Sequence, residues 1–444
     1  MSVADAAIQT AVAPSEARPW RRAALWLLFL APFFYVTYGG ANWLASLRTG
    51  VPSIVFGWER QIPFLDWTIF PYWSINAFYG LSLFVCASKT ELDTHGRRLL
   101  TAQIVAVLCF VLFPLHFTFT QPETHGFAGF LFAVLTGFDK PFNQAPSLHI
   151  ALLVILWVLY ARHVPRWALW LLHPWFLLVG ISVLTTYQHH FIDIPTGALL
   201  GFFCLWLWPD RGESPVAAFH LTDDRRRLVL AARYLAGALA TAALALWIGG
   251  AGWWLLWPAV SLLLVAANYA AFGAAGFQKG PDGDMSLAAR VLLAPYLLGA
   301  WINSRAWTRR EPAPVIVADG VALGRLPSRG VAADFATVID LSAELPRPEQ
   351  QVAWRAFPTL DLVVPQPQLL RAAAQAIEEG RARGPVLVCC ALGYSRSASA
   401  LATWLVAYGH AGNVATAVAR IRRARPQVVL GDATVAAIGR AAAP

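Results

Sequence analysis

The hydrophobic pattern divides the chain into a long apolar part and a shorter C-terminal part of mixed character. Eight apolar runs, separated by charged or turn-forming residues, predict helices that cross a lipid bilayer. They lie at 23–43, 71–88, 99–117, 147–164, 167–186, 193–209, 228–248 and 252–273. A ninth run at 126–139 is too short to cross, and it predicts a re-entrant or interfacial helix.

The pattern changes after the eighth run. A weaker apolar run at 288–302 has basic residues inside and behind it, including Arg290 and Arg305, and predicts an amphipathic helix lying on the cytoplasmic membrane surface. From Glu311 onward, short strand-like segments ("PVIVA", "ATVIDL", "VVP", "PVLVC") alternate with helical periodicity. The expected fold class is a polytopic α-helical membrane domain followed by a soluble α/β domain.

Composition and charge support a membrane protein and predict its orientation. Hydrophobic residues make up 57% of the 444 residues and charged residues only 13%, which leaves too little polar surface for a soluble chain. Most arginines between the spans share one side of the bilayer when the N-terminus is cytoplasmic. The net charge of +9 is therefore interpreted as a topology signal, and no nucleic-acid partner is expected.

Four regions are expected along the chain. A cytoplasmic tail at 1–22 precedes a six-span membrane domain at 23–209. A linker, two further spans and the interfacial helix occupy 210–310, and the α/β domain occupies 311–444. No set of thiols, imidazoles and carboxylates has metal-site spacing, so neither a metal nor another cofactor is expected.

The strongest chemical motif lies in the α/β region, where a predicted buried strand passes through a glycine turn into a helix. Cys390 and Arg396 have C-x5-R spacing there, and the backbone N–H groups of such a turn, with the helix dipole, form a cradle for a phosphate dianion. The same field stabilises a thiolate, which makes Cys390 a candidate nucleophile. Arg396 can hold two phosphate oxygens. Gly393, Ser395 and Ser397 are expected to line the phosphate, with Ser397 donating to the departing thiolate.

This motif resembles that of the protein tyrosine and dual-specificity phosphatase family, over roughly 313–440. The upstream segment "FPTLDLVVPQPQLL" is similar to the general-acid loop of the dual-specificity branch, in particular the phosphatidylglycerophosphate phosphatases. The resemblance implies that Asp361 protonates the leaving oxygen and then activates water. The family normally has histidine immediately before the nucleophile, whereas this chain has Cys389. That cysteine is interpreted as a small buried strand residue, with a reversible bond protecting Cys390 from oxidation as the alternative.

A second constellation lies at the predicted outer ends of two spans. The segment "APSLHIALL" carries Ser147 and His149, and "YQHHFIDIPTGALLG" carries His189 and Asp193. Ionisable groups gathered at one membrane depth are costly and indicate a functional site. The spacing of four residues predicts that His189 and Asp193 share one helical face, where the carboxylate can fix the imidazole tautomer. One imidazole could then attack phosphorus while His149 protonates the leaving group. The neighbouring His190 is interpreted as structural or interfacial.

These elements resemble the type-2 phosphatidic acid phosphatase superfamily, over roughly 23–209. The resemblance implies that His189 is the nucleophile, Asp193 its partner, His149 the acid and Ser147 a substrate-binding residue. The superfamily's two basic phosphate-binding positions are absent, which is similar to the sphingomyelin synthase and inositol phosphorylceramide synthase branch. Hydrolysis, headgroup transfer and phosphodiester cleavage therefore all remain open for this site.

As a whole, the chain resembles bacterial fusions of such a membrane domain to a dual-specificity phosphatase domain. The resemblance implies a multi-pass inner-membrane protein with its cysteine site in the cytoplasm, its His/Asp site facing the periplasm, and phospholipid phosphomonoesters as substrates. Two alternatives stay open. The cytoplasmic domain could be a protein phosphatase that regulates a membrane headgroup transferase, or the membrane domain could serve only as an anchor.

Overall fold

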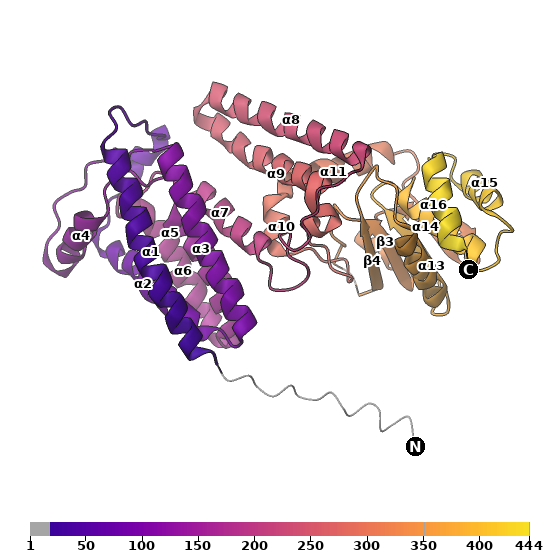
Figure 1. Ribbon diagram of the computed structural model, residues 1–444, viewed down its shortest axis with the longest axis horizontal. Helices are drawn as coiled ribbons and strands as arrows, with labels where there is room; N and C mark the ends of the chain where they lie inside the picture. Colours follow the sequence, from indigo (N-terminus) through magenta and orange to yellow (C-terminus); the bar gives the residue numbers. More distant parts are fainter. Residues whose placement is uncertain (1–17, 350, 444) are drawn as a thin grey trace, which may run out of the picture. The chain divides into compact units, whose positions relative to one another are not determined.

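A computed structural model describes residues 18–349 and 351–443, so most of the tail expected at 1–22 lies outside the described residues. The chain forms two compact units, which meet in the sequence between Arg211 and Gly212 (Figure 1). This division falls close to the expected boundary at 209/210.

The first unit is a helical bundle. Its helices are α1 (Trp20–Ser46), α2 (Ile69–Val85), α3 (Lys89–Leu112), α4 (Gly126–Phe138), α5 (Leu148–His163), α6 (Leu169–Thr185) and α7 (Asp193–Leu207), with single 3-10 turns at Gly57–Gln61, Asp66–Thr68 and Arg166–Ala168. Helix α5 lies in the middle of the bundle and packs against α2, α3, α6 and α7. Its apolar residues contribute to two buried clusters, so the residues at its start are held from several sides.

Six of these helices correspond to predicted spans, but one boundary was wrong. The helix predicted at 99–117 begins at Lys89 and ends at Leu112. It begins early because the Ser88 hydroxyl accepts a hydrogen bond from the Glu91 backbone N–H and caps the charged first turn. It ends before Pro114, whose ring disfavours helical geometry at the preceding residue.

Among the described residues, five helical segments are long and apolar enough to cross a membrane. They are Trp20–Ser46, Lys89–Leu112, Arg166–Thr185, Arg225–Ile248 and Gly250–Phe277. Helix α5, with 16 residues, is about 24 Å long. It is therefore shorter than a hydrocarbon core of about 30 Å, which is consistent with His149 near its start lying below the membrane surface.

The second unit begins with a helical hairpin. Helices α8 (Arg225–Ile248) and α9 (Leu256–Ala267) pack against each other, joined by Gly249 and Gly250 in positive-φ conformations and a 3-10 segment at Gly250–Leu255. A π-helical turn (Asn268–Phe272) and a 3-10 turn (Gly273–Phe277) follow α9. The single helix expected at 288–302 is two helices, α10 (Leu287–Leu292) and α11 (Ala294–Trp307), because Pro295 starts a new helix.

The rest of the second unit is an α/β fold around a five-stranded sheet of order β1-β2-β5-β3-β4. The strands are β1 (Val315–Ala318), β2 (Val321–Arg325), β3 (Thr337–Ser342), β4 (Ala353–Thr359) and β5 (Val386–Cys390). Only the β1–β2 pair is antiparallel. The segment "VVP", expected as a strand, is a loop that follows a turn at Asp361 and Leu362, where Leu362 has a φ of 59°.

Helices cover both faces of this sheet. Helices α13 (Pro367–Arg381), α14 (Arg396–Ala407), α15 (Val414–Ala424) and α16 (Asp432–Ala442) surround the larger apolar core on one face. The other face packs a smaller cluster that includes Ala332 of α12 (Arg329–Ala332) and Ala300 of α11. Parallel strands need this coverage, since both of their faces are apolar.

The segment preceding the expected domain start at Glu311 is part of the same packing. The loop 279–285 lies against the edge strand β4, where the Ala356 N–H donates to the Pro281 carbonyl at 2.8 Å. The Arg347 guanidinium holds the Asp284 carboxylate of this loop with two hydrogen bonds of 3.1 and 2.9 Å. The α/β domain therefore includes contacts from residues that sequence reasoning placed in the linker.

Candidate active sites

The cysteine loop joins the end of β5 to the start of α14. Gly393 has a φ of 78°, and a Cβ there would lie 2.5 Å from the Gly324 carbonyl, so the turn needs glycine on both counts. The Gly393 N–H and the Ser397 hydroxyl donate to Cys390 Sγ at 3.2 and 3.3 Å. These donors stabilise negative charge on the sulfur, which is the role expected of Ser397 when the thiolate leaves. Ser395 lies directly before α14, at the turn into the helix.

Arg396 is buried at the centre of a carboxylate cluster. Its guanidinium donates to both oxygens of Glu344 at 2.7 and 2.6 Å and to the Thr359 carbonyl at 2.7 Å. Burial opposes charge on both partners, but the Glu344 carboxylate raises the pKa of Arg396 well above its usual value. In turn, the Arg396 charge outweighs burial and lowers the pKa of Glu344. The arginine is therefore held charged and in one orientation, ready for a phosphate.

Glu344 was missed by sequence reasoning. It follows β3 directly, and β3 lies beside β5 in the sheet. Because the carboxyl ends of parallel neighbours meet at one edge, an acidic residue after a buried strand next to the cysteine strand was a signal that could have identified it.

Asp361 lies in the loop that follows β4 and faces the same arginine. Its Oδ1 is 3.0 Å from Arg396 Nη2, and its side chain is one-third exposed. The structure thus brings the expected acid, the arginine and the cysteine loop together, although their sequence positions span 361–396. An exposed carboxyl beside the phosphate-binding group has the access that a general acid needs.

Replacing Asp361 with asparagine is expected to lower kcat for phosphate release by roughly 10²–10⁴-fold. The amide has nearly the shape of the carboxyl group but can neither protonate a leaving oxygen nor activate water. The loss should be smaller for para-nitrophenyl phosphate, whose leaving group needs little protonation, than for an alkyl phosphate. Steady-state kinetics with both substrates checks this, and an equal loss with both would contradict the assignment.

Cys389 lies on the other side of the sheet from its neighbour. Successive strand residues point to opposite faces, and Cys389 packs in the smaller cluster while Cys390 borders the larger one. Both thiols are free, and Cys389 is fully buried. Burial raises the pKa of the Cys389 thiol well above its usual value, so this group is neutral. Its position supports the interpretation as a buried strand residue.

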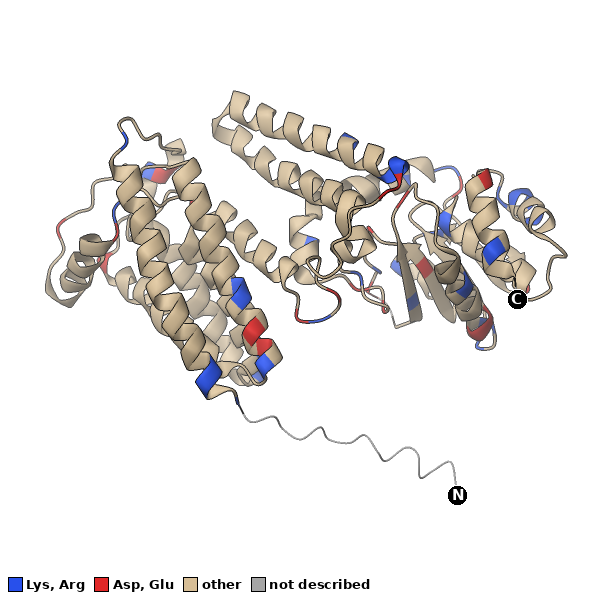
Figure 2. Cartoon of the chain, in the orientation of Figure 1, with Lys and Arg blue, Asp and Glu red and all other residues tan. Residues whose placement is uncertain are grey.

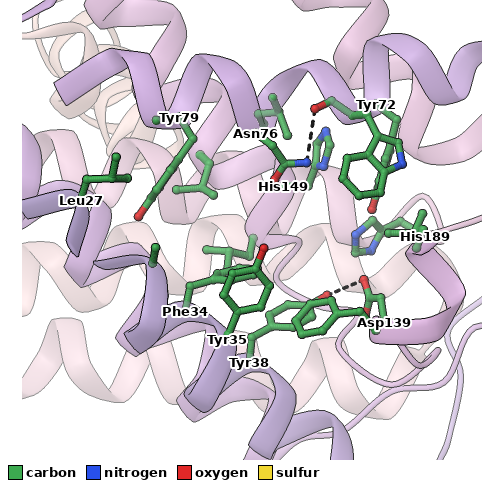
Figure 3. A pocket seen from close by; sticks show the side chains of 18 residues that line it. Leu27, Phe34, Tyr35, Tyr38, Tyr72, Asn76, Tyr79, Asp139, His149 and His189 are labelled. Atoms are coloured by element: carbon green, nitrogen blue, oxygen red, sulfur yellow. Dashed lines mark hydrogen bonds between the residues drawn. The ribbon is translucent and has the colours of Figure 1, made fainter. Parts of the chain in front are cut away.

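The His/Asp constellation borders a cavity of about 280 Å³ in the first unit (Figure 3). Residues from α1, α2 and α5 line it, together with Asp139 and His189 from two loops. His149 and His189 both face this cavity from different elements, as expected for two groups that act on one substrate. None of the described lining residues is lysine or arginine, in keeping with the absent basic motifs.

His189 is oriented by hydrogen bonds at both ring nitrogens. Its Nδ1 lies 3.1 Å from Asp193 Oδ2, and its Nε2 lies 3.1 Å from the Ser147 hydroxyl. A carboxylate only accepts, so the proton is on Nδ1, and Nε2 keeps the lone pair that a nucleophile needs.

The predicted contact is present, but the predicted reason for it was wrong. His189 does not share a helical face with Asp193, because α7 begins at Asp193 and His189 lies in the preceding turn. The carboxylate folds back onto that turn and also accepts the His190 backbone N–H at 3.0 Å.

His149 lies in the first turn of α5, with its imidazole stacked on the Tyr72 ring at 4.3 Å between centroids. Its Nε2 is buried and has no hydrogen-bond partner among the described residues. A buried polar nitrogen without a partner is rare, and one that borders a cavity indicates a group meant to contact a ligand. His149 is thus placed to exchange a proton with a molecule in the cavity.

Two carboxylates near this cavity were not predicted. Asp139 accepts hydrogen bonds from the Tyr38 hydroxyl and the Asn42 amide, both at 2.9 Å. Glu59 lies 3.0 Å from Nδ1 of His190, which supports the structural interpretation of that histidine. Both carboxylates lie in loops or short turns, where hydrophobic periodicity gives no information. Within the described residues, no cluster of three or more His, Cys, Asp or Glu could hold a metal ion.

No family model matches the chain, and a search of curated proteins gave no match. Solved structures of dual-specificity and related phosphatases match about 30% of it. Human DUSP28 is 24% identical, with 30% of this chain and 94% of that chain covered at a TM-score of 0.28. PTPMT1 in complex with PI(5)P is 19% identical, with 28% and 92% covered at a TM-score of 0.26. Tk-PTP in its active form is 24% identical, with 30% and 97% covered at a TM-score of 0.26.

Proposed function

We propose that this chain is a membrane-bound phosphoric monoester hydrolase that acts on the headgroup phosphates of phospholipids such as phosphatidylglycerophosphate. The reaction proceeds through a cysteinyl phosphate at Cys390, on the cytoplasmic side of a bacterial inner membrane. A second site at His189 and His149, on the outer side, cleaves or transfers phospho-headgroups.

The proposed mechanism uses groups that lie around one loop. The Cys390 thiolate attacks phosphorus while Arg396 and the loop N–H groups hold the phosphate oxygens, and Asp361 gives its proton to the departing lipid oxygen. The S–P bond is then broken by water, from which Asp361 takes a proton. Ser397 donates to the sulfur as it leaves as thiolate. Glu344 keeps Arg396 oriented through both steps.

The observation that carries the lipid assignment is a contact between the acid loop and the helical hairpin. The Tyr269 hydroxyl, from the turn after α9, donates to the Asp361 carbonyl at 3.1 Å. Its ring stacks on Tyr234 of α8 at 5.3 Å between centroids. Both helical segments of this hairpin are long and apolar enough to cross a membrane. A catalytic loop fixed to the base of such a hairpin is held at the bilayer, where lipid phosphates are concentrated.

Charge at the base of the hairpin supports the same assignment. Arg225, Arg226 and Arg227 form the first turn of α8, and Figure 2 shows charged side chains gathered at that end of the helix. Basic residues beside a membrane attract anionic lipid headgroups by about 1 kcal/mol each. Helix α11 adds a contact on the other side of the site, where the Ser304 hydroxyl donates to the Ala391 carbonyl of the cysteine loop.

For the outer site, the cavity favours catalysis over a role as anchor. His149 and His189 come from segments 40 residues apart, yet both face one cavity, and only one of them is tied to a carboxylate. An anchor has no use for a buried imidazole nitrogen without a partner.

Substrate preference tests the proposal. Purified full-length protein in mixed micelles should release phosphate from phosphatidylglycerophosphate or phosphatidic acid with a kcat/KM at least about tenfold above that for a phosphotyrosine peptide. The gain is expected because lipid and catalytic loop share one surface. Preference for the peptide would instead support the alternative of a regulatory protein phosphatase.

A further inference from the structure

One buried lysine reaches the catalytic region from outside the expected α/β domain. Lys279 follows the last turn of the hairpin segment, after Gln278 in the left-handed conformation. Its ammonium group is completely buried beneath β3. Nζ lies 2.5 Å from Asp340 Oδ2, 2.8 Å from the Ser342 carbonyl, 3.1 Å from the Ser342 hydroxyl and 2.6 Å from the Leu345 carbonyl.

Burying an ammonium group is costly unless every proton finds an acceptor and the charge finds a partner. Both conditions are met at Lys279. Asp340 supplies the opposite charge, and its other oxygen is occupied by the Ser342 N–H and hydroxyl, each at 2.8 Å. The Ser342 hydroxyl therefore donates to Asp340 and accepts from Lys279. This arrangement is closed, with no room for solvent and no unused donor on the lysine.

The acceptors share one feature: they belong to the segment that carries Glu344. The carbonyls of Ser342 and Leu345 flank this glutamate on both sides, and Asp340 precedes it on β3. Glu344 in turn grips both nitrogens of the Arg396 fork. We propose that Lys279 is a positioning residue, which fixes the Glu344 segment and through it the orientation of Arg396 for phosphate binding; this inference rests on the proposed phosphatase function.

Docking of the 279–285 loop does not by itself require the lysine. Arg347 holds Asp284 of that loop through two hydrogen bonds, and its backbone N–H donates to the Gly283 carbonyl at 3.0 Å. These contacts do not touch Glu344 or its neighbours on β3. Arg347 is thus a matched comparison: it anchors the same loop at a different point, without a link to the catalytic arginine.

The test compares Lys279→Met with Arg347→Met in the full-length protein, using para-nitrophenyl phosphate as substrate and inorganic phosphate as competitive inhibitor. Lys279→Met is expected to lower kcat/KM and to raise the inhibition constant of phosphate, each by about tenfold or more, because Arg396 is no longer held for the oxyanion. Arg347→Met should change both by less than about threefold. Thermal unfolding is measured on each variant, since a purely structural lysine would change the melting temperature without changing phosphate affinity.

A double variant adds a second criterion. If Lys279 acts through Glu344, Lys279→Met combined with Glu344→Gln should be no worse than Glu344→Gln alone within about threefold, whereas independent effects multiply. If Lys279→Met does not fold, Asp340→Asn decides by the same phosphate criterion, because it keeps the shape of the site and removes only the lysine's charge partner.

Three results would overturn the assignment: unchanged phosphate inhibition in a folded variant, an equal loss in Arg347→Met, or multiplicative effects in the double variant. Absence of wild-type activity towards para-nitrophenyl phosphate would count against the proposed function instead.

Discussion

Cys390→Ser is expected to lower phosphate release from lipid phosphomonoesters by roughly four orders of magnitude or more, which is typical of losing a nucleophile. Serine preserves the size of the side chain and its place beside Gly393 and Ser397. Its hydroxyl remains protonated at neutral pH, however, and the loop cannot supply a base to activate it. Phosphate release from phosphatidylglycerophosphate micelles measures the effect, and trapping of a phosphoenzyme after acid quench should succeed only with the wild type.

The neighbouring thiol provides the matched control. Cys389→Ser changes the same atoms one residue earlier, but on the opposite face of β5. It is expected to retain activity within about tenfold and to lose some stability, because a hydroxyl is buried in an apolar cluster. Activity that survives in Cys390→Ser, or is abolished equally in Cys389→Ser, would refute the cysteinyl-phosphate mechanism.

The sequence predicted the positions of the helices and the contents of the cysteine loop well, because both depend on local pattern. Apolar length located all eight long helical segments, and the strand, glycine and arginine around Cys390 lie within one short stretch. It did not predict the start of α3, since a side-chain cap let a helix run through charged residues. Nor did it predict that the linker residue Lys279 packs beneath β3.

The parts that escaped sequence reasoning are contacts between distant segments. Glu344, Lys279 and Asp139 carry no motif, and each gains its role only from neighbours that folding brings near. The pair His189 and Asp193 is instructive, since its spacing suggested a helical face while the structure achieves the contact across a turn. A motif can therefore report proximity correctly without reporting the local structure that produces it.

His189→Ala is expected to abolish the outer reaction, with a loss of at least about a thousandfold. The assay is best run on protein that already carries Cys390→Ser, so that remaining lipid turnover belongs to the first unit. Phosphatidic acid and a phosphodiester lipid serve as substrates, with release of phosphate or headgroup and transfer to a second lipid as readouts. His189 is expected to be essential because its Nε2 is the nitrogen that faces both Ser147 and the cavity, with Asp193 holding the proton on Nδ1.

His190 offers the control for loss of a buried histidine paired with a carboxylate. It is as deeply buried as His189 and is bound to Glu59, but its rings and hydrogen bonds face Phe117 and Thr118 and not the cavity. His190→Gln should lower thermal stability while keeping turnover within about tenfold. Because His149 acts as the acid in the same scheme, His149→Gln should impair turnover by about a hundredfold. Full outer activity in His189→Ala would leave the first unit as an anchor, and the phosphatase chemistry would then belong to Cys390 alone.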